Sequence, residues 1–231
     1  MAIANETAPA MTDVAIDAEH LSRRFGRRWA LTDVSFKVPA GAVMMVAGRN
    51  GSGKSTLLRV LSTVIRPDQG RVSIAGFDAV RDRYDVRRSV ALLSHYSYLY
   101  EQLTARENLQ VAADHLGIHR NGIMNLLDRV TLAQRADDPV VTFSAGMRKR
   151  LSFARVLLQD PKVVFLDEPY GQLDPPGFAL VDDVVRELKA RGATVLVATH
   201  QLERGGRLAD LALTLEQGRV QSFGPAEEAR A

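Results

Sequence analysis

The 231-residue chain contains no cysteine, so disulfide bonds and thiolate metal sites are excluded. It also lacks any apolar run near the roughly 20 residues that a membrane-spanning helix needs. Basic residues exceed acidic ones only as 30 to 27, and a net charge of +3 is too small to indicate nucleic-acid binding. We expect a protein of the cytoplasm that reaches the inner membrane only through partners.

The first residues have neither the basic start nor the apolar core of a secretory signal, and residues 1–12 are predicted to form a flexible tail. The hydrophobic fraction of 46% and the charged fraction of 25% are typical of globular proteins. No internal repeat or low-complexity segment interrupts the chain. A single domain over residues 13–231 is therefore expected.

Short apolar runs alternate with amphipathic segments along this domain. Strands are expected at 14–21, 30–38, 42–47, 71–74, 162–166 and 193–198, and helices at 54–65, 104–117, 123–130, from about 144, and at 177–190. Alternating strands and helices favour an α/β fold with a mixed, largely parallel sheet and helices on its faces. Residues 92–150 contain predicted helices and no predicted strand. This indicates a helical subdomain of about residues 92–150, inserted into a core of residues 13–91 and 151–231.

The stretch GRNGSGKST follows the apolar run at 42–47 and opens a predicted helix. Its spacing G-x-x-x-x-G-K-[ST] is that of the P-loop, in which backbone N–H groups wrap an anion. Lys54 would reach the β- and γ-phosphates of a nucleotide, and Ser55 would hold Mg²⁺. The pattern predicts nucleotide binding but does not distinguish kinases, GTPases and motors. The phosphate-site residues are Gly48, Asn50, Gly51, Ser52, Gly53, Lys54, Ser55 and Thr56.

The stretch VVFLDEP places two carboxylates at the end of a predicted buried strand. Ligands of open α/β sheets bind at such carboxyl ends. Asp167 is the candidate Mg²⁺ residue, and Glu168 is placed to orient or deprotonate a water molecule. His200 ends another buried strand, where it is either structural or a contact of the γ-phosphate.

These motifs, with FSAGMRKR at residues 143–150, resemble those of the ATP-binding-cassette (ABC) family of ATPases. Ser144, Ala145 and Gly146 occupy the place of the family's signature LSGGQ. The sequence departs from that signature at Phe143, Ala145 and Met147. GQLDP at residues 171–175 resembles the D-loop. The similarity covers about residues 14–224.

The resemblance implies that ATP and Mg²⁺ are bound between two chains, either identical or related. Lys54 of one chain would face Ser144 and Gly146 of the other, while Phe25 would stack on adenine and Asp174 would act from the D-loop. Glu168 and His200 would serve hydrolysis. ATP would close the dimer and hydrolysis would reopen it.

The sequence is most similar to compact bacterial exporter ATPases, such as the haem exporter of cytochrome c biogenesis, which work with separate membrane subunits. Two other possibilities remain: an importer ATPase, and an ABC ATPase that acts on the ribosome or on nucleic acid. The single cassette and the short helical insert favour transport, and no direct contact with nucleic acid is expected.

The family's loop at the junction of core and insert carries a glutamine, and here that position falls on His95 or Tyr96. Neither residue is glutamine, which puts the usual metal contact in doubt. Tyr98 and Tyr100 alternate with Tyr96, so an extended segment would place all three on one side. They would then form either a surface for a helix of a membrane partner or a packing contact between insert and core.

Overall fold

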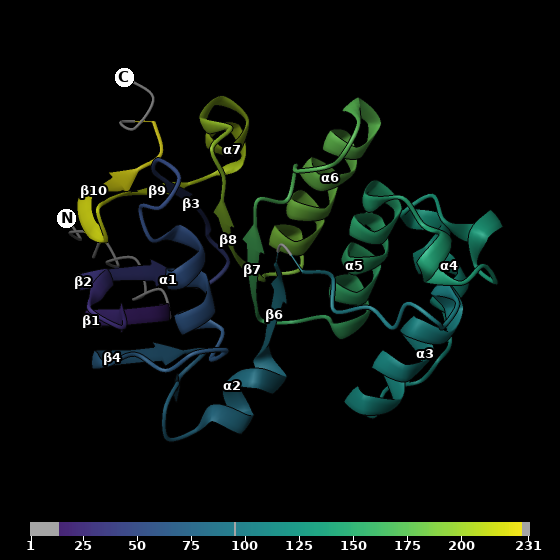
Figure 1. Ribbon diagram of the computed structural model, residues 1–231, viewed down its shortest axis with the longest axis horizontal. Helices are drawn as coiled ribbons and strands as arrows, with labels where there is room; N and C mark the ends of the chain where they lie inside the picture. The colour runs from purple at the N-terminus through teal and green to yellow at the C-terminus, as the bar shows by residue number, and fades with distance from the viewer. Residues whose placement is uncertain (1–13, 95, 228–231) are drawn as a thin grey trace, which may run out of the picture.

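The computed structural model describes residues 14–94 and 96–227, so the predicted tail at residues 1–12 and His95 lie outside the described residues. The described chain is an α/β structure with two sheets, and the predicted fold class is confirmed (Figure 1). The strands are β1 Val14–Phe25, β2 Arg28–Pro39, β3 Val43–Ala47, β4 Gln69–Ile74, β5 Phe77–Asp78, β6 Val90–Leu93, β7 Val163–Asp167, β8 Thr194–Ala198, β9 Leu211–Glu216 and β10 Arg219–Pro225. The α-helices are α1 Lys54–Leu61, α2 Arg83–Ser89, α3 Ala105–Leu116, α4 Ile123–Arg129, α5 Ala145–Gln159, α6 Pro175–Ala190 and α7 Leu202–Leu208. Short 3-10 turns are η1 Ala133–Arg135 and η2 Val140–Thr142.

The larger sheet has six strands in the order β10-β9-β3-β8-β7-β6. All neighbours from β9 to β6 pair in parallel, and β10 pairs antiparallel with β9. Every residue of β3, β7 and β8 is buried. Strands of a parallel sheet are covered on both faces, which explains why these segments are continuous apolar runs in the sequence.

The two faces of this sheet belong to different hydrophobic clusters. On one face, Val164 and Val195 pack with the apolar sides of α5 and α6. On the other face, Phe165 and Leu196 pack with α1 and with the smaller sheet. Successive side chains of a buried strand point to opposite faces, so each strand of this sheet contacts a different layer on either side.

The smaller sheet has the order β2-β1-β4-β5 and is antiparallel throughout. The strands predicted at 14–21, 30–38 and 71–74 lie in this sheet, and the sequence does not indicate that they are separate from the parallel sheet. The burial of β2 alternates from Val34 onward, as in a sheet with one covered face. This sheet covers α1 and positions the turn between β1 and β2 beside the P-loop.

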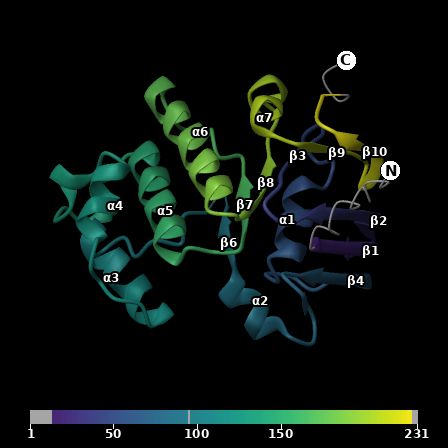
Figure 2. The same cartoon turned by 180° about the vertical axis from the view of Figure 1, so that it is seen from behind.

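Helices α3, α4 and α5 gather at the far end of the molecule from the smaller sheet (Figures 1 and 2). The predicted start of α3 is confirmed: the Thr104 hydroxyl accepts from the Glu107 N–H at 3.1 Å, and the Glu107 carboxylate accepts from the Thr104 N–H at 2.8 Å. Gly117 ends α3 at a φ of 66°. Among the described residues, no helix combines the length and hydropathy needed to cross a bilayer.

Several element boundaries differ from the predicted ones. The expected start of the helical insert at residue 92 lies within β6, which pairs with β7 in the core sheet. Helix α6 begins at Pro175, two residues before the predicted start, because the Asp174 side chain caps it and proline is favoured in a first turn. The elements α2, β5, β6, α7, β9 and β10 were not predicted.

Candidate functional site

The loop of residues 48–56 joins β3 to α1 and takes its shape from glycines. Gly48, Gly51 and Gly53 have φ values of 141°, 80° and 112°, which residues with a side chain rarely adopt. A Cβ on Gly48 would lie 2.3 Å from the carbonyl oxygen of Leu215. The loop is therefore pressed against β9, and it leads into the first turn of α1, whose N–H groups have no partner within the helix.

Two polar side chains of the loop are buried. The Lys54 amine donates to the carbonyl oxygens of Gly48 at 2.7 Å and Arg49 at 3.2 Å. The Ser52 hydroxyl oxygen has no hydrogen-bond partner among the described residues. An ammonium group, an unpartnered hydroxyl and the N–H groups of a helix start together suit a phosphate.

Asp167 at the end of β7 lies against the start of α1. The Ser55 hydroxyl donates to its carboxylate at 3.0 Å, although the two residues are 112 positions apart. Burial, more than the neighbouring Glu168, raises the pKa of the Asp167 carboxyl above its usual value. A hydroxyl and a buried carboxylate this close form a donor set that fits Mg²⁺, which binds oxygen ligands and retains water.

Glu168, the residue after Asp167, contacts His200, which lies just beyond the end of β8. The Nδ1 atom of His200 lies 2.8 Å from the Glu168 carboxylate, and the Thr199 hydroxyl donates to the same oxygen at 3.5 Å. The Glu168 backbone has a φ of 46°, and its N–H donates to the Ala198 carbonyl at 2.8 Å. A non-glycine residue held in this region marks a constrained position.

A cleft of about 1380 Å³ contains the P-loop residues and Glu168. Phe25 lines it from the end of β1, with 47% of its surface exposed. Two further parts of the wall were not predicted from the sequence. One is the β1–β2 turn with Arg28 and Trp29; the signal available was a pair of aromatics flanking a short basic turn. The other is the β9–β10 connection, whose Gly218 N–H donates to the Ser52 carbonyl at 2.9 Å.

The predicted signature residues lie away from this cleft. The Ser144 hydroxyl caps α5 by accepting from the Met147 N–H at 3.2 Å, and Ala145 and Gly146 form the first turn of α5. Asp174 caps α6 through the Gly177 N–H at 3.0 Å and also binds Arg150 of α5 at 2.9 Å. Strands β6, β7 and β8 stand between α5 and α1 (Figures 1 and 2). Within one chain, these residues do not join the P-loop.

The tyrosine segment is a surface loop rather than an extended strand. Tyr96, Tyr98 and Tyr100 are 71%, 63% and 60% exposed, so most of each side chain is not covered by packing between insert and core. Tyr98 has a φ of 50°, which interrupts the expected alternation. Arg155 of α5 donates to the carbonyl oxygens of Ser97 at 3.0 Å and Tyr98 at 2.9 Å, which attaches the loop to the helical subdomain.

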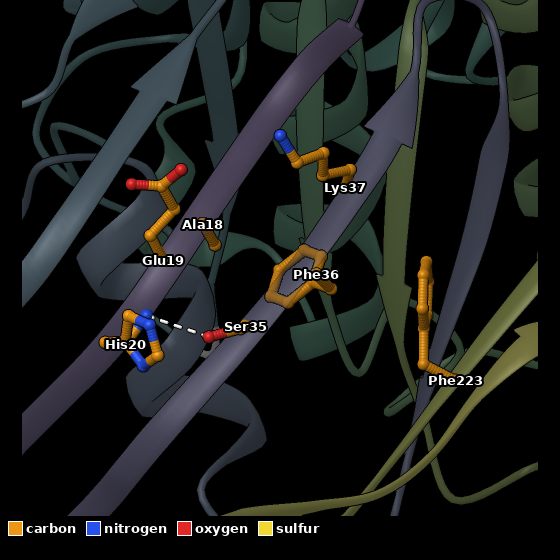
Figure 3. Close-up of a pocket in the computed structure, with 7 residues that line it drawn as sticks. All are labelled: Ala18, Glu19, His20, Ser35, Phe36, Lys37 and Phe223. Atoms are coloured by element: carbon orange, nitrogen blue, oxygen red, sulfur yellow. Dashed lines mark hydrogen bonds between the residues drawn. The ribbon is translucent and has the colours of Figure 1, made fainter.

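A second hollow, of about 580 Å³, lies on the smaller sheet beside β10 and contains none of the predicted site residues (Figure 3). The rings of Phe36 and Phe223 stand 6.1 Å apart at one side of it. At the other side, the His20 backbone N–H donates to the Ser35 hydroxyl at 2.9 Å. The chemistry-bearing residues gather instead at the carboxyl edge of the larger sheet.

Comparisons with known proteins agree with this arrangement. Residues 31–171 match the ABC transporter family, which is more than half of the chain. The daunorubicin resistance ATP-binding protein DrrA3 of Streptomyces coeruleorubidus is 43% identical over 225 residues, which cover 96% of this chain and 71% of that protein. The Nod factor export ATP-binding protein I of Sinorhizobium fredii is 35% identical, and the match covers 93% of this chain and 64% of that protein.

A solved ATP-binding subunit of an ABC transporter superposes with a TM-score of 0.86 at 30% identity, covering 94% of this chain and 92% of that one. The chain thus spans about two-thirds of the length of its relatives and nearly all of a solved ATP-binding subunit. Fold, motif order and similarity lead to one assignment: the chain belongs to the ABC transporter family and is an ATP-binding subunit.

Proposed function

We propose that this chain hydrolyses ATP with Mg²⁺ and couples the opening and closing of an ATPase dimer to export through separate membrane subunits. The observation that carries the proposal is the convergence of Lys54, Ser55, Asp167, Glu168 and His200 at one sheet edge. A cation-lined phosphate cradle next to a carboxylate pair is the arrangement that phosphoryl transfer to water requires.

Each residue has a distinct role in this proposal. Lys54 and the P-loop N–H groups bind the β- and γ-phosphates, and Ser55 and Asp167 hold Mg²⁺, which neutralises charge on the phosphates. Glu168 orients the attacking water and accepts its proton. His200 contacts the Glu168 carboxylate and fixes it. In this proposal His200 would also contact the γ-phosphate.

A second chain completes the site. Ser144, Ala145 and Gly146 lie at a helix start on the surface of the subunit, where N–H groups and the helix dipole favour phosphate. We infer that they contact the ATP of a partner subunit, identical or related, and that Asp174 acts at the same interface. ATP drives closure because it binds the closed dimer more tightly than the open one. We also infer that the chain divides into a core and a helical subdomain, a division that would separate the P-loop from the signature.

Export rests on the names of the relatives, which concern daunorubicin resistance and Nod factor export. The exposed rings of Tyr96, Tyr98 and Tyr100 form a surface that suits an apolar helix of a membrane subunit. In this proposal the protein sits on the cytoplasmic face of the membrane through that partner. The partner determines the substrate.

ATP binding and phosphate release measured on the purified chain test the enzymatic part. Lys54→Ala should lose binding or turnover, whereas Lys37→Ala, which removes an exposed lysine of the smaller sheet, should match the unaltered chain. Glu168→Gln should bind ATP, lose most turnover and accumulate as a dimer in size-exclusion chromatography. Near-normal hydrolysis by Glu168→Gln would refute its assigned role.

Pull-down of the tagged chain from membranes tests the transport part. The expected result is a hydrophobic membrane protein that remains bound after ATP is removed. Recovery of ribosomes or nucleic acid in place of a membrane protein would refute export and support the non-transport alternative.

A further inference from the structure

A network of side chains close to Glu168 and His200 lies outside every motif found in the sequence. Its members are Tyr170, Phe178, Asp182 and Arg204. Tyr170 follows Glu168 by two residues and is 1% exposed. Phe178 and Asp182 lie on α6, which begins directly after Asp174, and Arg204 lies on α7, four residues after His200.

The contacts within the network join three segments of the chain. The Tyr170 hydroxyl donates to one oxygen of the Asp182 carboxylate at 2.8 Å, and Arg204 donates to the other oxygen at 2.8 Å. The Arg204 guanidinium carbon also lies 5.7 Å from the centre of the Tyr170 ring and 5.2 Å from that of Phe178. The two rings meet edge to face, with centres 5.9 Å apart.

These contacts are of the stronger kinds available to side chains. The Asp182 side chain is only 16% exposed, so its negative charge is stabilised by Arg204 and the Tyr170 hydroxyl more than by water. Burial, followed by the bond to Asp182, raises the pKa of Tyr170 well above its usual value, so its hydroxyl remains a donor at all physiological pH values. A planar guanidinium next to two aromatic rings gains cation–π attraction that an ammonium group does not reproduce in the same geometry.

The network is attached closely to the strand end that carries His200. A Cβ on Gly205 would lie 2.9 Å from the Thr199 side chain and 3.0 Å from the Met45 sulfur. Helix α7 therefore packs directly on β3 and on the residue before His200. Tyr170 lies two residues after Glu168, and Arg204 of α7 lies four residues after His200. The network therefore connects the two segments that carry Glu168 and His200, whose side chains lie 2.8 Å apart.

We propose that Tyr170, Asp182 and Arg204 are positioning residues. They hold the turn of residues 168–171, which begins at Glu168, at a fixed distance from His200. The proposal rests on the function assigned above to Glu168 and His200. None of the three residues needs to contact ATP. Their effect should therefore fall on the chemical step and not on nucleotide affinity.

The test compares steady-state ATP hydrolysis by the full chain and its variants. Arg204→Gln and Tyr170→Phe should lower kcat by roughly 10- to 100-fold, the scale expected when a reacting group is displaced by up to about 1 Å. Their KM for ATP should stay within about twofold, because the P-loop contacts are untouched. Arg204→Lys should recover only part of kcat, because it restores the charge opposite Asp182 without the contact to both rings.

The double variant Tyr170→Phe with Arg204→Gln separates positioning from general weakening. If both residues act through Asp182, its kcat should be close to that of the worse single variant, since coupled contacts are not additive. Asp183→Asn and Arg186→Gln are the matched controls. They remove an exposed ion pair of the same helix, 3.1 Å long, and should leave kcat unchanged.

The outcomes separate this proposal from the one on which it rests. If the unaltered chain binds ATP without hydrolysing it, the proposed function fails. If the unaltered chain hydrolyses ATP and Glu168→Gln does not, but Arg204→Gln and Tyr170→Phe keep the normal kcat, the network proposal alone is overturned. It is also overturned if kcat falls only in proportion to the folded fraction measured by circular dichroism. Tyr170→Phe keeps the buried ring, so it provides a folded variant.

Discussion

Replacing Lys149 with methionine should stabilise the nucleotide-free protein at neutral pH. Lys149 lies on α5 between Arg148 and Arg150, which both donate to oxygen atoms nearby. Lys149 is half-buried and, within the described part of the chain, has neither a hydrogen bond nor an ion pair. Burial lowers its pKa from 10.5 to about 8, against the opposing charges of Asp167 and Glu168.

The size of the effect follows from the difference between the folded and unfolded pKa values. The unfolded chain takes up the proton below pH 10.5, but the folded chain does so only below about pH 8. The free energy of unfolding therefore falls as the pH is lowered through this window and is level below it. The cost to the folded state is about 3 kcal/mol at pH 7 and about half of that at pH 9.5.

Urea unfolding at pH 7, 8, 9 and 9.5, with EDTA and without nucleotide, measures this difference directly. Lys149→Met should be the more stable protein at pH 7, and its advantage should shrink by about 2 kcal/mol by pH 9.5. Lys162→Met, which removes an exposed lysine, controls for the loss of a positive charge. An advantage that stays constant with pH, or grows as the pH rises, would refute the reasoning.

Three further predictions concern the nucleotide site. Gly48→Ala should abolish ATP binding or lower the folded fraction, because its Cβ would lie 2.3 Å from the Leu215 carbonyl oxygen; equilibrium dialysis with ATP and circular dichroism distinguish the two results. Phe25→Ala should weaken ATP binding by roughly 3- to 10-fold, the range for one aromatic stacking contact, as measured by calorimetry. Chains carrying Lys54→Ala and Ser144→Arg should each be inactive alone, and their mixture should recover part of the ATPase rate; a mixture that stays inactive removes support for the shared site.

The sequence predicted the parts of this fold that depend on local chemistry. The runs at 42–47, 162–166 and 193–198 became β3, β7 and β8 because a strand buried on both faces needs no polar side chain. Thr104 and Glu107 predicted the start of α3 because a capping box is complete within four residues. The P-loop glycines lie within six residues of one loop, so their positive φ also follows from local sequence.

The missed elements depend on contacts between distant residues. Strand β10 is mostly exposed and shows no alternation of apolar and polar residues, so only its pairing with β9 defines it. The same holds for the separation of the two sheets, since nothing local tells β1 to pair with β4 instead of β3. Arg204 was missed for a similar reason: its partners Tyr170 and Asp182 come from another part of the chain, and no spacing relates them.

The strand order explains why distant motifs form one site. Parallel strands bring their carboxyl ends to the same edge, so the loop after β3 and Asp167 at the end of β7 face the same side. Because β8 lies between β3 and β7, the residues after β8 emerge between the P-loop and the carboxylate pair. His200 is therefore adjacent to Glu168, whose N–H donates to the last residue of β8, Ala198. An order with β7 directly beside β3 would remove His200 from between them, so the placement of His200 beside Glu168 is a consequence of topology and not of its position in the sequence.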